Sequence, residues 1–327
     1  MTFGPDHYVP VLKTKRGEKS ALRSVATSLQ SRITPLLEIV EKNKETLSAH
    51  LDNSFEKLAE SVSPYSRCFI DARELAPDGQ RGALDVFKRA TDAGITFTPV
   101  TGVSRTADVG AALEYQANGL ALRLSKNDLD QGELAKKIST FIVQYRLVPN
   151  QVDLILDLGP VEELIEEGVA AFAEAFMANV PDHQEWRTFT ISACAFSKSL
   201  GKIEPSSYAS IERDEWLAWK DYLYDQRRDL VRLPTFSDCA IQHPDGVEGF
   251  DPRVMAASAA IRYALEKEWL IIKGKSTKRV LPSKQFPGLA NTLVYGDCKA
   301  SYLGESHCNG CQSMKNAADG GPKLGSP

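Results

Sequence analysis

The chain has 327 residues, of which 43% are hydrophobic and 25% charged, and a formal net charge of −4 at pH 7. These are the values of an ordinary globular protein, and the mild acidity excludes a general DNA-coating role, which needs a strong basic field. Because the sequence shows neither a signal-like apolar segment at its start nor a membrane-length apolar window, we expect neither secretion nor a membrane span. Cys68, Cys194 and Cys239 lie singly in apolar runs, which favours buried thiols and a reducing, cytoplasmic location.

Eight short apolar or β-branched runs recur along the chain, and such runs predict buried strands. They span Tyr8–Lys13, Ile33–Val40, Cys68–Ala72, Ile95–Thr101, Leu120–Ser125, Val152–Leu158, Thr188–Cys194 and Leu233–Ala240. Several stretches between them place apolar residues three and four positions apart, which is the pattern of an amphipathic helix. These helical stretches span Lys19–Leu29, Gly82–Ala93, Ala107–Ala117, Glu133–Tyr145, Val161–Met177 and Asp214–Tyr224.

Strands that alternate with helices form a parallel sheet with helices packed against it. The sheet could be open or split, or it could close into a barrel. Eight strand–helix units within about 245 residues match the size of a closed (β/α)8 barrel. We therefore predict an α/β fold, with a TIM-like (β/α)8 barrel over residues 1–245 and a C-terminal helix-strand extension over residues 246–327.

Within this extension the pattern predicts a helix over Val254–Leu265, a short strand over Trp269–Ile272 and a basic loop over Lys273–Arg279. From Lys315 onward the chain is rich in glycine, proline and small residues, a composition typical of disorder.

Charged residues stand at six of the eight predicted strand ends. This position matters because the active sites of barrel proteins lie at the carboxyl ends of the strands. The candidate catalytic residues are Lys13, Glu38, Asp71, Asp157 and Asp238. The candidate binding residues are Lys15, Arg73, Arg123 and His243.

These charges have more than one explanation. Strands often end on polar residues only because they emerge into water, and a structural ion-pair network gives the same pattern. Converging acids and bases would instead have shifted pKa values, as acid–base chemistry requires. The carboxylates could also hold a divalent cation, and the basic residues could bind a phosphate or carboxylate. Lys13 could alternatively form a Schiff base.

A second cluster lies near the carboxyl end of the chain. Cys298, His307, Cys308 and Cys311 give the spacing C-x8-H-C-x2-C. Thiolates and imidazoles are the preferred ligands of zinc, so these four residues are candidate metal ligands. The alternative is a loop with free thiols, because a second CxxC is missing and adjacent residues do not easily bind one ion.

Two motifs stand at the first two predicted strands: Tyr8-Val9-Pro10-Val11-Leu12-Lys13-Thr14-Lys15-Arg16-Gly17-Glu18, followed by Ala21-Leu22, and Ile33-Thr34-Pro35-Leu36-Leu37-Glu38-Ile39. Weaker matches follow at Asp71, Pro99-Val100, Leu122-Arg123, Asp157-Leu158-Gly159, Ser237-Asp238 and His243-Pro244. Over most of its length the chain thus resembles the Beta protein family of phages, satellite elements and bacteria.

The founding phage member of that family is known for preventing a companion toxin from killing the host cell. The resemblance therefore implies a role in phage–host conflict, but it assigns no catalytic residue. It also implies a tryptophan- and histidine-containing continuation beyond Pro327.

Two functions are open at this point. The first is a binding or regulatory protein of a phage-defence or toxin-neutralising locus, whose charged barrel mouth recognises a toxin, a phage component or an anionic small molecule. The second is an enzyme acting on a phosphate- or carboxylate-bearing substrate. In the enzyme, the acidic residues would serve as acid–base or cation-binding groups, and Lys13, Arg73 and Arg123 would anchor the anion.

Overall fold

The computed structural model describes residues 3–41, 45–130, 132–226, 230, 232–245 and 257–320. Contacts within the chain divide it into two compact units. The barrel unit comprises Met1–Cys194 and Glu215–Ala240, and the C-terminal unit comprises Ala195–Asp214 and Ile241–Pro327. The segment Ala195–Asp214, which follows the seventh predicted strand, thus belongs to the C-terminal unit.

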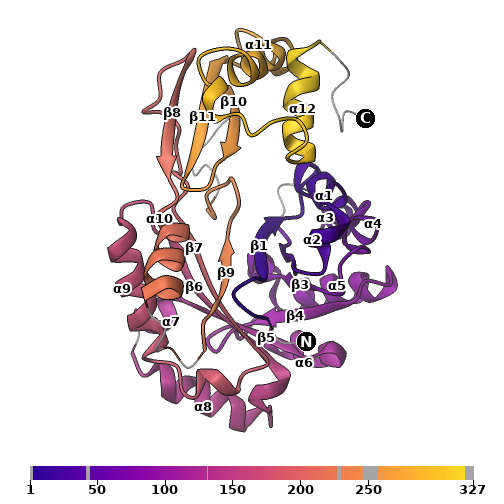
Figure 1. Cartoon of the computed structure of the whole chain (residues 1–327). Helices are drawn as coiled ribbons and strands as arrows, with labels where there is room; N and C mark the ends of the chain where they lie inside the picture. Colours follow the sequence, from indigo (N-terminus) through magenta and orange to yellow (C-terminus); the bar gives the residue numbers. More distant parts are fainter. Residues whose placement is uncertain are drawn as a thin grey trace. The chain divides into compact units, whose positions relative to one another are not determined.

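The barrel unit is built on eight parallel strands that close into a barrel (Figure 1). The strands are β1 (Tyr8–Lys13), β2 (Leu36–Glu38), β3 (Cys68–Asp71), β4 (Phe97–Thr101), β5 (Leu120–Ser125), β6 (Val152–Pro160), β7 (Thr188–Cys194) and β9 (Thr235–Asp238). Each strand pairs with the next in this order, and β9 pairs with β1 to complete the ring. The predicted (β/α)8 barrel is therefore confirmed, and each predicted run overlaps one of its strands.

Helices occupy the connections between the strands. They are α1 (Arg16–Arg23), α2 (Thr27–Gln30), α3 (Leu47–Phe55), α4 (Leu58–Val62), α5 (Gly79–Asp92), α6 (Val109–Glu114), α7 (Lys126–Asp130), α8 (Leu134–Gln144), α9 (Glu166–Met177) and α10 (Asp214–Leu217). A π-helix, Ala218–Gln226, continues α10. The sequence pattern did not predict α3, whose first turn is capped by the Thr46 hydroxyl accepting from the Ala49 amide at 3.3 Å.

The barrel strands are buried along nearly their whole length, as expected for a parallel sheet with side chains packed on both faces. Every residue of β3, β4, β7 and β9 is buried. Helix α5 illustrates the covering layer, because its apolar side chains Val86, Phe87 and Ala90 are fully buried. This continuous core fixes the strand ends, and with them the positions of the charged residues that follow.

The C-terminal unit contains a three-stranded antiparallel sheet in the order β10 (Ser258–Ala264), β11 (Glu268–Ser276), β8 (Ser207–Glu212). Helices α11 (Pro282–Val294) and α12 (Asn309–Ala318) complete it. Its hydrophobic core is formed by Ile261, Tyr263, Leu270, Ile272, Ala290, Leu293, Cys298, Cys311 and Ala317. The strand predicted at Trp269–Ile272 is confirmed as part of β11.

The helix predicted over Val254–Leu265 is wrong for the described residues, because Ser258–Ala264 forms β10; residues 254–256 lie outside the described part. The run is short and alanine-rich, so its apolar positions fit more than one period. Burial alternates at Ile261 and Tyr263, which pair across the sheet with residues of β11. A partner strand therefore decided the structure of this segment.

Two further expectations for this unit are corrected. Lys273–Ser276 is the end of β11 and not a loop, and the buried Lys273 ammonium donates to the carbonyls of Leu200 and Ile203 at 2.8 and 2.5 Å. The tail is helical in α12 as far as Ala318, because Cys311 and Ala317 are buried in the core; residues 321–327 lie outside the described part. Within the described residues, no helix combines the length and the apolar composition that crossing a membrane requires.

Candidate functional site

Seven charged side chains meet at the carboxyl ends of the barrel strands, in what we call the ion-pair ring. Its members are Glu38, Asp71, Arg73, Arg105, Asp108, Arg123 and Asp157. Glu38, Asp71, Arg123 and Asp157 belong to strands, whereas Arg73, Arg105 and Asp108 belong to the segments that follow β3 and β4. The structure thus brings together five of the residues that were predicted as candidates at separate strand ends.

Arg123 lies at the centre of the ring and is 3% exposed. One guanidinium nitrogen, Nη1, donates to Glu38 Oε1 at 2.7 Å and to Asp71 Oδ2 at 3.0 Å. Nε donates to Asp157 Oδ2 at 2.8 Å, and Nη2 lies 2.7 Å from the same oxygen. The planar guanidinium can bind three carboxylates at once because its donors are held in a fixed fork.

Arg73 forms the more exposed edge of the ring, with 31% of its side chain accessible. Its Nη2 lies 2.6 Å from Glu38 Oε1, and Nη1 donates to Asp157 Oδ2 at 3.3 Å. The 3-10 turn Arg73–Asp78 that follows β3 positions it, and its backbone amide donates to Asp71 Oδ1 at 3.0 Å. Arg73 is therefore the guanidinium of the ring that a ligand reaches most easily.

Arg105 and Asp108 were not predicted, because the sequence analysis considered strand ends and not the loops beyond them. Arg105 Nη2 donates to Asp71 Oδ1 at 2.6 Å, and its Nε donates to Asp108 Oδ2 at 2.8 Å. The Thr101 hydroxyl, at the end of β4, donates to Asp108 Oδ1 at 2.6 Å. An Arg-x-x-Asp spacing directly after a predicted barrel strand is the signal that could have identified them.

The turn after β4 requires a residue without a side chain. A Cβ at Gly102 would lie 2.8 Å from the backbone carbonyl oxygen of Arg123 and 2.9 Å from the Arg105 side chain. Because no real Cβ approaches backbone that closely, Gly102 lets the β4 loop pass over β5. This close approach is what brings Arg105 to Asp71.

The carboxylates of the ring differ in their pKa values. Burial raises the pKa of Asp71, but Arg105, Arg123 and Arg73 outweigh it, and the net pKa lies well below the usual range. The pKa of Asp157 is also lowered, because Arg123 and Arg73 outweigh burial. The pKa of Asp108 is raised, because burial outweighs Arg105 and Thr101. Asp71 and Asp157 are therefore held ionised at neutral pH.

The remaining predicted site residues lie outside the ion-pair ring. The Lys13 ammonium donates to Glu74 at 3.3 Å, Lys15 is exposed in the loop after β1, and Asp238 accepts from the Tyr8 hydroxyl and, at 2.9 Å, from the Ala240 amide. Since side chains alternate along a strand, Asp238 faces the opposite side of β9 from Ser237. His243 belongs to the C-terminal unit, where its Nδ1 accepts from the Asp245 amide at 3.2 Å.

A second buried ion-pair cluster lies at the amino ends of the strands. Asp153, near the start of β6, receives two bidentate arginines: Arg67 at 2.7 and 3.0 Å and Arg187 at 2.5 and 3.0 Å. The Thr188 hydroxyl donates to it at 2.7 Å. Although burial opposes ionisation, these partners lower the pKa of Asp153. Burial of charge alone therefore does not mark the functional end of this barrel.

A cavity of about 570 Å³ lies at the same amino end, lined in part by Asn118, Gly119, Arg146 and Arg187. It is remote from the ion-pair ring, and in barrel proteins this end carries stability more than chemistry. Gly119 has φ +93°, and a Cβ there would lie 2.3 Å from Arg187 Nη1. We therefore interpret this cavity as a result of packing the Arg187 side chain against Gly119, and not as the functional site.

The lowered pKa of His7, which precedes β1, predicts that the stability of the barrel depends on pH. Its ring stacks on Phe3 at 3.9 Å between centroids, its Nε2 lies 3.0 Å from the Thr34 hydroxyl, and burial, with the charge of Arg67, lowers its pKa from 6.5 to about 4. A lowered histidine pKa means that the unfolded chain binds the proton first. We expect the stability of the barrel to be full above pH 6.5 and to fall as the pH drops from 6.5 to 4.

Denaturant unfolding of the wild type and His7→Gln across this pH range measures the effect. The variant should show a flatter dependence, because glutamine does not titrate. Equal slopes for the two proteins would contradict the prediction.

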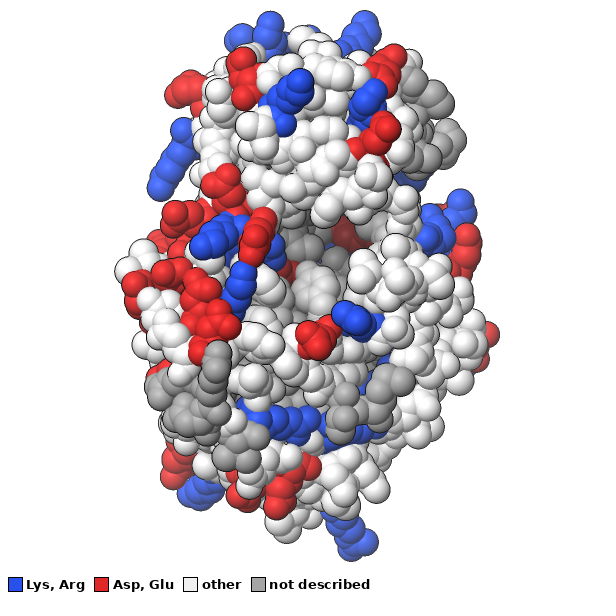
Figure 2. All heavy atoms as spheres, in the orientation of Figure 1, with Lys and Arg blue, Asp and Glu red and all other residues white. Residues whose placement is uncertain are grey.

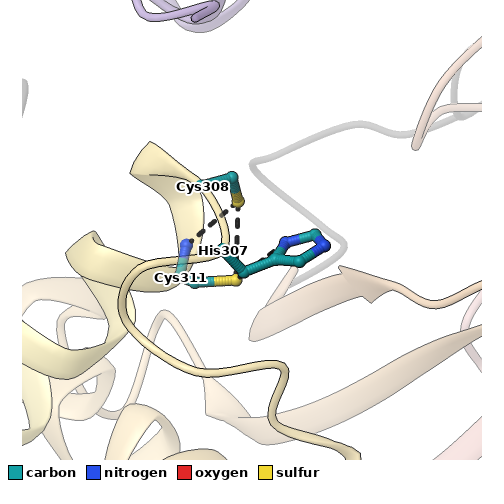
Figure 3. Close-up of side chains that lie close together, drawn as sticks. All are labelled: His307, Cys308 and Cys311. Carbon is teal, nitrogen blue, oxygen red and sulfur yellow. Dashed lines mark hydrogen bonds between the residues drawn. The ribbon is translucent and has the colours of Figure 1, made fainter.

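The carboxyl-terminal cysteine cluster is partly assembled. His307, Cys308 and Cys311 converge around the start of α12, with their ligand atoms all within 4.8 Å of one another (Figure 3). Cys298 is not in this group, although it belongs to the same hydrophobic core. Burial raises the pKa of the Cys308 thiol, but the Cys311 amide and His307 outweigh it, so that the net pKa is lowered.

A closed parallel barrel with its ion pairs at the carboxyl ends of the strands defines an α/β protein of the (β/α)8-barrel class. The chain belongs to the Beta protein family, whose model matches residues 8–327. No curated protein gives a significant match to it.

Proposed function

We propose that this chain is a cytoplasmic recognition protein of phage–host conflict, which neutralises a toxin or responds to a phage component by binding it at the carboxyl face of the barrel. Membership of the Beta protein family supports the role in conflict. The six cysteines are all free, which fits a reducing compartment. The ion pairs of the ring and the ionised state of its carboxylates Asp71 and Asp157 support a role in recognising a charged partner.

The observation that carries this proposal is the set of pKa values in the ring. A general acid or base at neutral pH needs a pKa near the working pH. The pKa values of Asp71 and Asp157 are instead lowered, and Arg123 binds both carboxylates directly. A paired, ionised network of this kind, with Arg73 at its accessible edge, suits the recognition of a charged partner better than it suits proton transfer.

The charge balance of the ring indicates what the partner presents. Four carboxylates share three guanidinium groups, so the described ring carries one excess negative charge. Each of these carboxylates is buried and paired with an arginine, whereas the accessible charge of the ring is the Arg73 guanidinium, which favours an acidic side chain of a protein partner. The same pairing leaves the carboxylate oxygens poorly placed for a divalent cation, which would have to displace an arginine. Figure 2 supports a local site, because basic and acidic side chains are intermixed on the face that it draws.

Arg73→Ala tests the proposal, because Arg73 is at the accessible edge of the ring and Arg123 can still pair the carboxylates. Each protein encoded beside this chain's gene is co-expressed with it, and growth and phage plating are measured. We expect the wild type to relieve the toxicity of one neighbour or to change plating. Arg73→Ala should lose this effect, because losing one partner of an interfacial charge pair costs about 2–5 kcal/mol.

Arg81→Ala is the matched control, because its side chain is 83% exposed on α5 and only approaches Asp85 at 3.7 Å. It should protect as the wild type does. Lys13→Met provides a second change on the same face, and circular dichroism verifies that each variant is folded. Equal protection by all the variants would exclude the carboxyl face of the barrel as the binding site. If the wild type has no effect in either assay, the role in phage–host conflict is excluded.

A second candidate function is an enzyme acting on a phosphate- or carboxylate-bearing substrate. The observation that favours it is the contrast between Asp108, whose pKa is raised, and Asp71, whose pKa is lowered, although both accept from Arg105. Carboxyl groups with opposed pKa values can divide acid and base roles. Loss of protection in Asp108→Asn, with partner binding intact, would favour this function over recognition alone.

A further inference from the structure

The group His307, Cys308 and Cys311 lies in the C-terminal unit, outside the ion-pair ring and outside the proposed function. Cys311 is 1% exposed, whereas His307 and Cys308 are exposed at the surface. One of the three residues is thus held in the core and two are exposed; Figure 3 shows their side chains close together at the start of α12. A metal ion could therefore enter without unfolding the unit.

Two of the three separations between donor atoms are close to those around one tetrahedral ion, and all three are within 4.8 Å. Bonds of about 2.3 Å to sulfur and about 2.0–2.1 Å to nitrogen place the ligands of zinc about 3.6–3.8 Å apart. The two sulfur atoms are 3.4 Å apart, and His307 Nδ1 lies 3.7 Å from Cys311 Sγ. The adjacency of His307 and Cys308 in the sequence is therefore no obstacle, because the turn before α12 brings the imidazole to Cys311.

Both sulfur atoms also have donors that would stabilise a thiolate. The backbone amide of Cys311 lies 3.4 Å from Cys308 Sγ, where it caps the first turn of α12. The Tyr263 hydroxyl, from β10, lies 3.0 Å from Cys311 Sγ. Hydrogen bonds of this kind orient and tune metal ligands in the same way as the outer partners of known sites.

Cys298 has a different environment. It is 4% exposed in the hydrophobic core of the unit, and it does not belong to the group of donor atoms that lie within 4.8 Å of one another. The three converging donors leave one position of a tetrahedral ion for a ligand from outside this group. Water can occupy that position.

We propose that His307, Cys308 and Cys311 bind one zinc ion, with Cys298 outside the site. The ion bridges the loop before α12 to a sulfur atom that is held in the core next to β10 and α11. The ion holds the two thiols together as thiolates and keeps them from forming a disulfide.

Cobalt titration of the reduced, chelator-treated full chain tests this proposal. Cobalt(II) in a tetrahedral site with thiolate ligands gives intense visible bands and a sulfur-to-metal charge-transfer absorption. We expect one equivalent of cobalt to produce both, and one equivalent of zinc to abolish them. Elemental analysis of protein purified from zinc-containing medium should give one zinc per chain.

Cys308→Ser should lose the charge-transfer intensity contributed by one thiolate. It should also bind zinc at least about tenfold more weakly, because a residue that binds the metal directly contributes more than one that only hydrogen-bonds to a ligand. His307→Gln should weaken binding but retain the charge-transfer absorption. Cys298→Ala is the matched control and should keep the spectrum and the stoichiometry. Circular dichroism verifies that each variant is folded.

Three results would overturn the proposal. The first is the absence of cobalt–thiolate absorption in the reduced wild type. The second is an unchanged spectrum in Cys308→Ser. The third is metal-free purified protein that shows four reactive thiols instead of six after denaturation, with Cys308 and Cys311 found joined in a disulfide.

Discussion

Arg123→Met is expected to lower the free energy of unfolding of the barrel by about 3–5 kcal/mol, because it removes one partner of a buried ion-pair network and leaves charges uncompensated. The guanidinium is 3% exposed and contacts Glu38, Asp71 and Asp157. Methionine fills a similar volume, so the loss reflects charge more than packing. Urea unfolding at pH 7 measures it, with Arg81→Met as the exposed control, for which we expect a change within about 0.5 kcal/mol.

The effect of Arg123→Met should depend on pH in a defined direction. In the wild type, the lowered pKa values of Asp71 and Asp157 contribute stability that is present above their ordinary pKa of 3.8 and lost as the pH falls further. In the variant those carboxylates lose a cation, so their pKa values rise and protonation relieves the repulsion. The difference in the free energy of unfolding between the wild type and Arg123→Met should therefore become smaller as the pH is lowered from 7 to 4.

A charge-removal series separates this explanation from a packing effect. Arg123→Met combined with Glu38→Gln and Asp71→Asn should be more stable than Arg123→Met alone, because Glu38 and Asp71 are then no longer buried charges that have lost Arg123. If the triple variant is as unstable as the single one at every pH, the electrostatic explanation is wrong.

Asp153→Asn is expected to destabilise the barrel by about 3 kcal/mol, because it leaves Arg67 and Arg187 facing each other at the amino end. Asparagine keeps the shape and some hydrogen bonds, including one with the Thr188 hydroxyl, so the lost charge dominates. Thermal and urea unfolding measure the change. Asp85→Asn, which alters an exposed pair, should cost less than about 1 kcal/mol.

The comparison of Asp153→Asn with Arg73→Ala distinguishes the two ends of the barrel. Under conditions where both variants are folded, Asp153→Asn should retain protection in cells and Arg73→Ala should lose it. Loss of protection in a folded Asp153→Asn would instead give the amino end, with its 570 Å³ cavity, a part in the function.

The sequence by itself determined the barrel and five of the seven members of the ion-pair ring. Eight apolar runs that alternate with helical stretches have few packed solutions, and parallel strands end at one edge, so Glu38, Asp71, Arg123 and Asp157 had to converge. The reach of Arg105 to Asp71 could not be predicted in this way, because it depends on a turn at Gly102 that passes close to β5. Asp238 was predicted as a site residue because it ends a strand, but its hydrogen bonds are with Tyr8 and Ala240.

Only the tertiary structure decided the C-terminal unit. Residues 258–264 have a pattern that fits helix or strand, and their pairing with β11 makes them a strand. β8 pairs with β11 across more than fifty residues of sequence, a contact that no local pattern contains. The same holds for the cysteine cluster, where spacing suggested four candidate ligands and the fold brings the donor atoms of three of them within 4.8 Å of one another. Local periodicity sets which elements form, whereas long-range pairing sets which side chains meet.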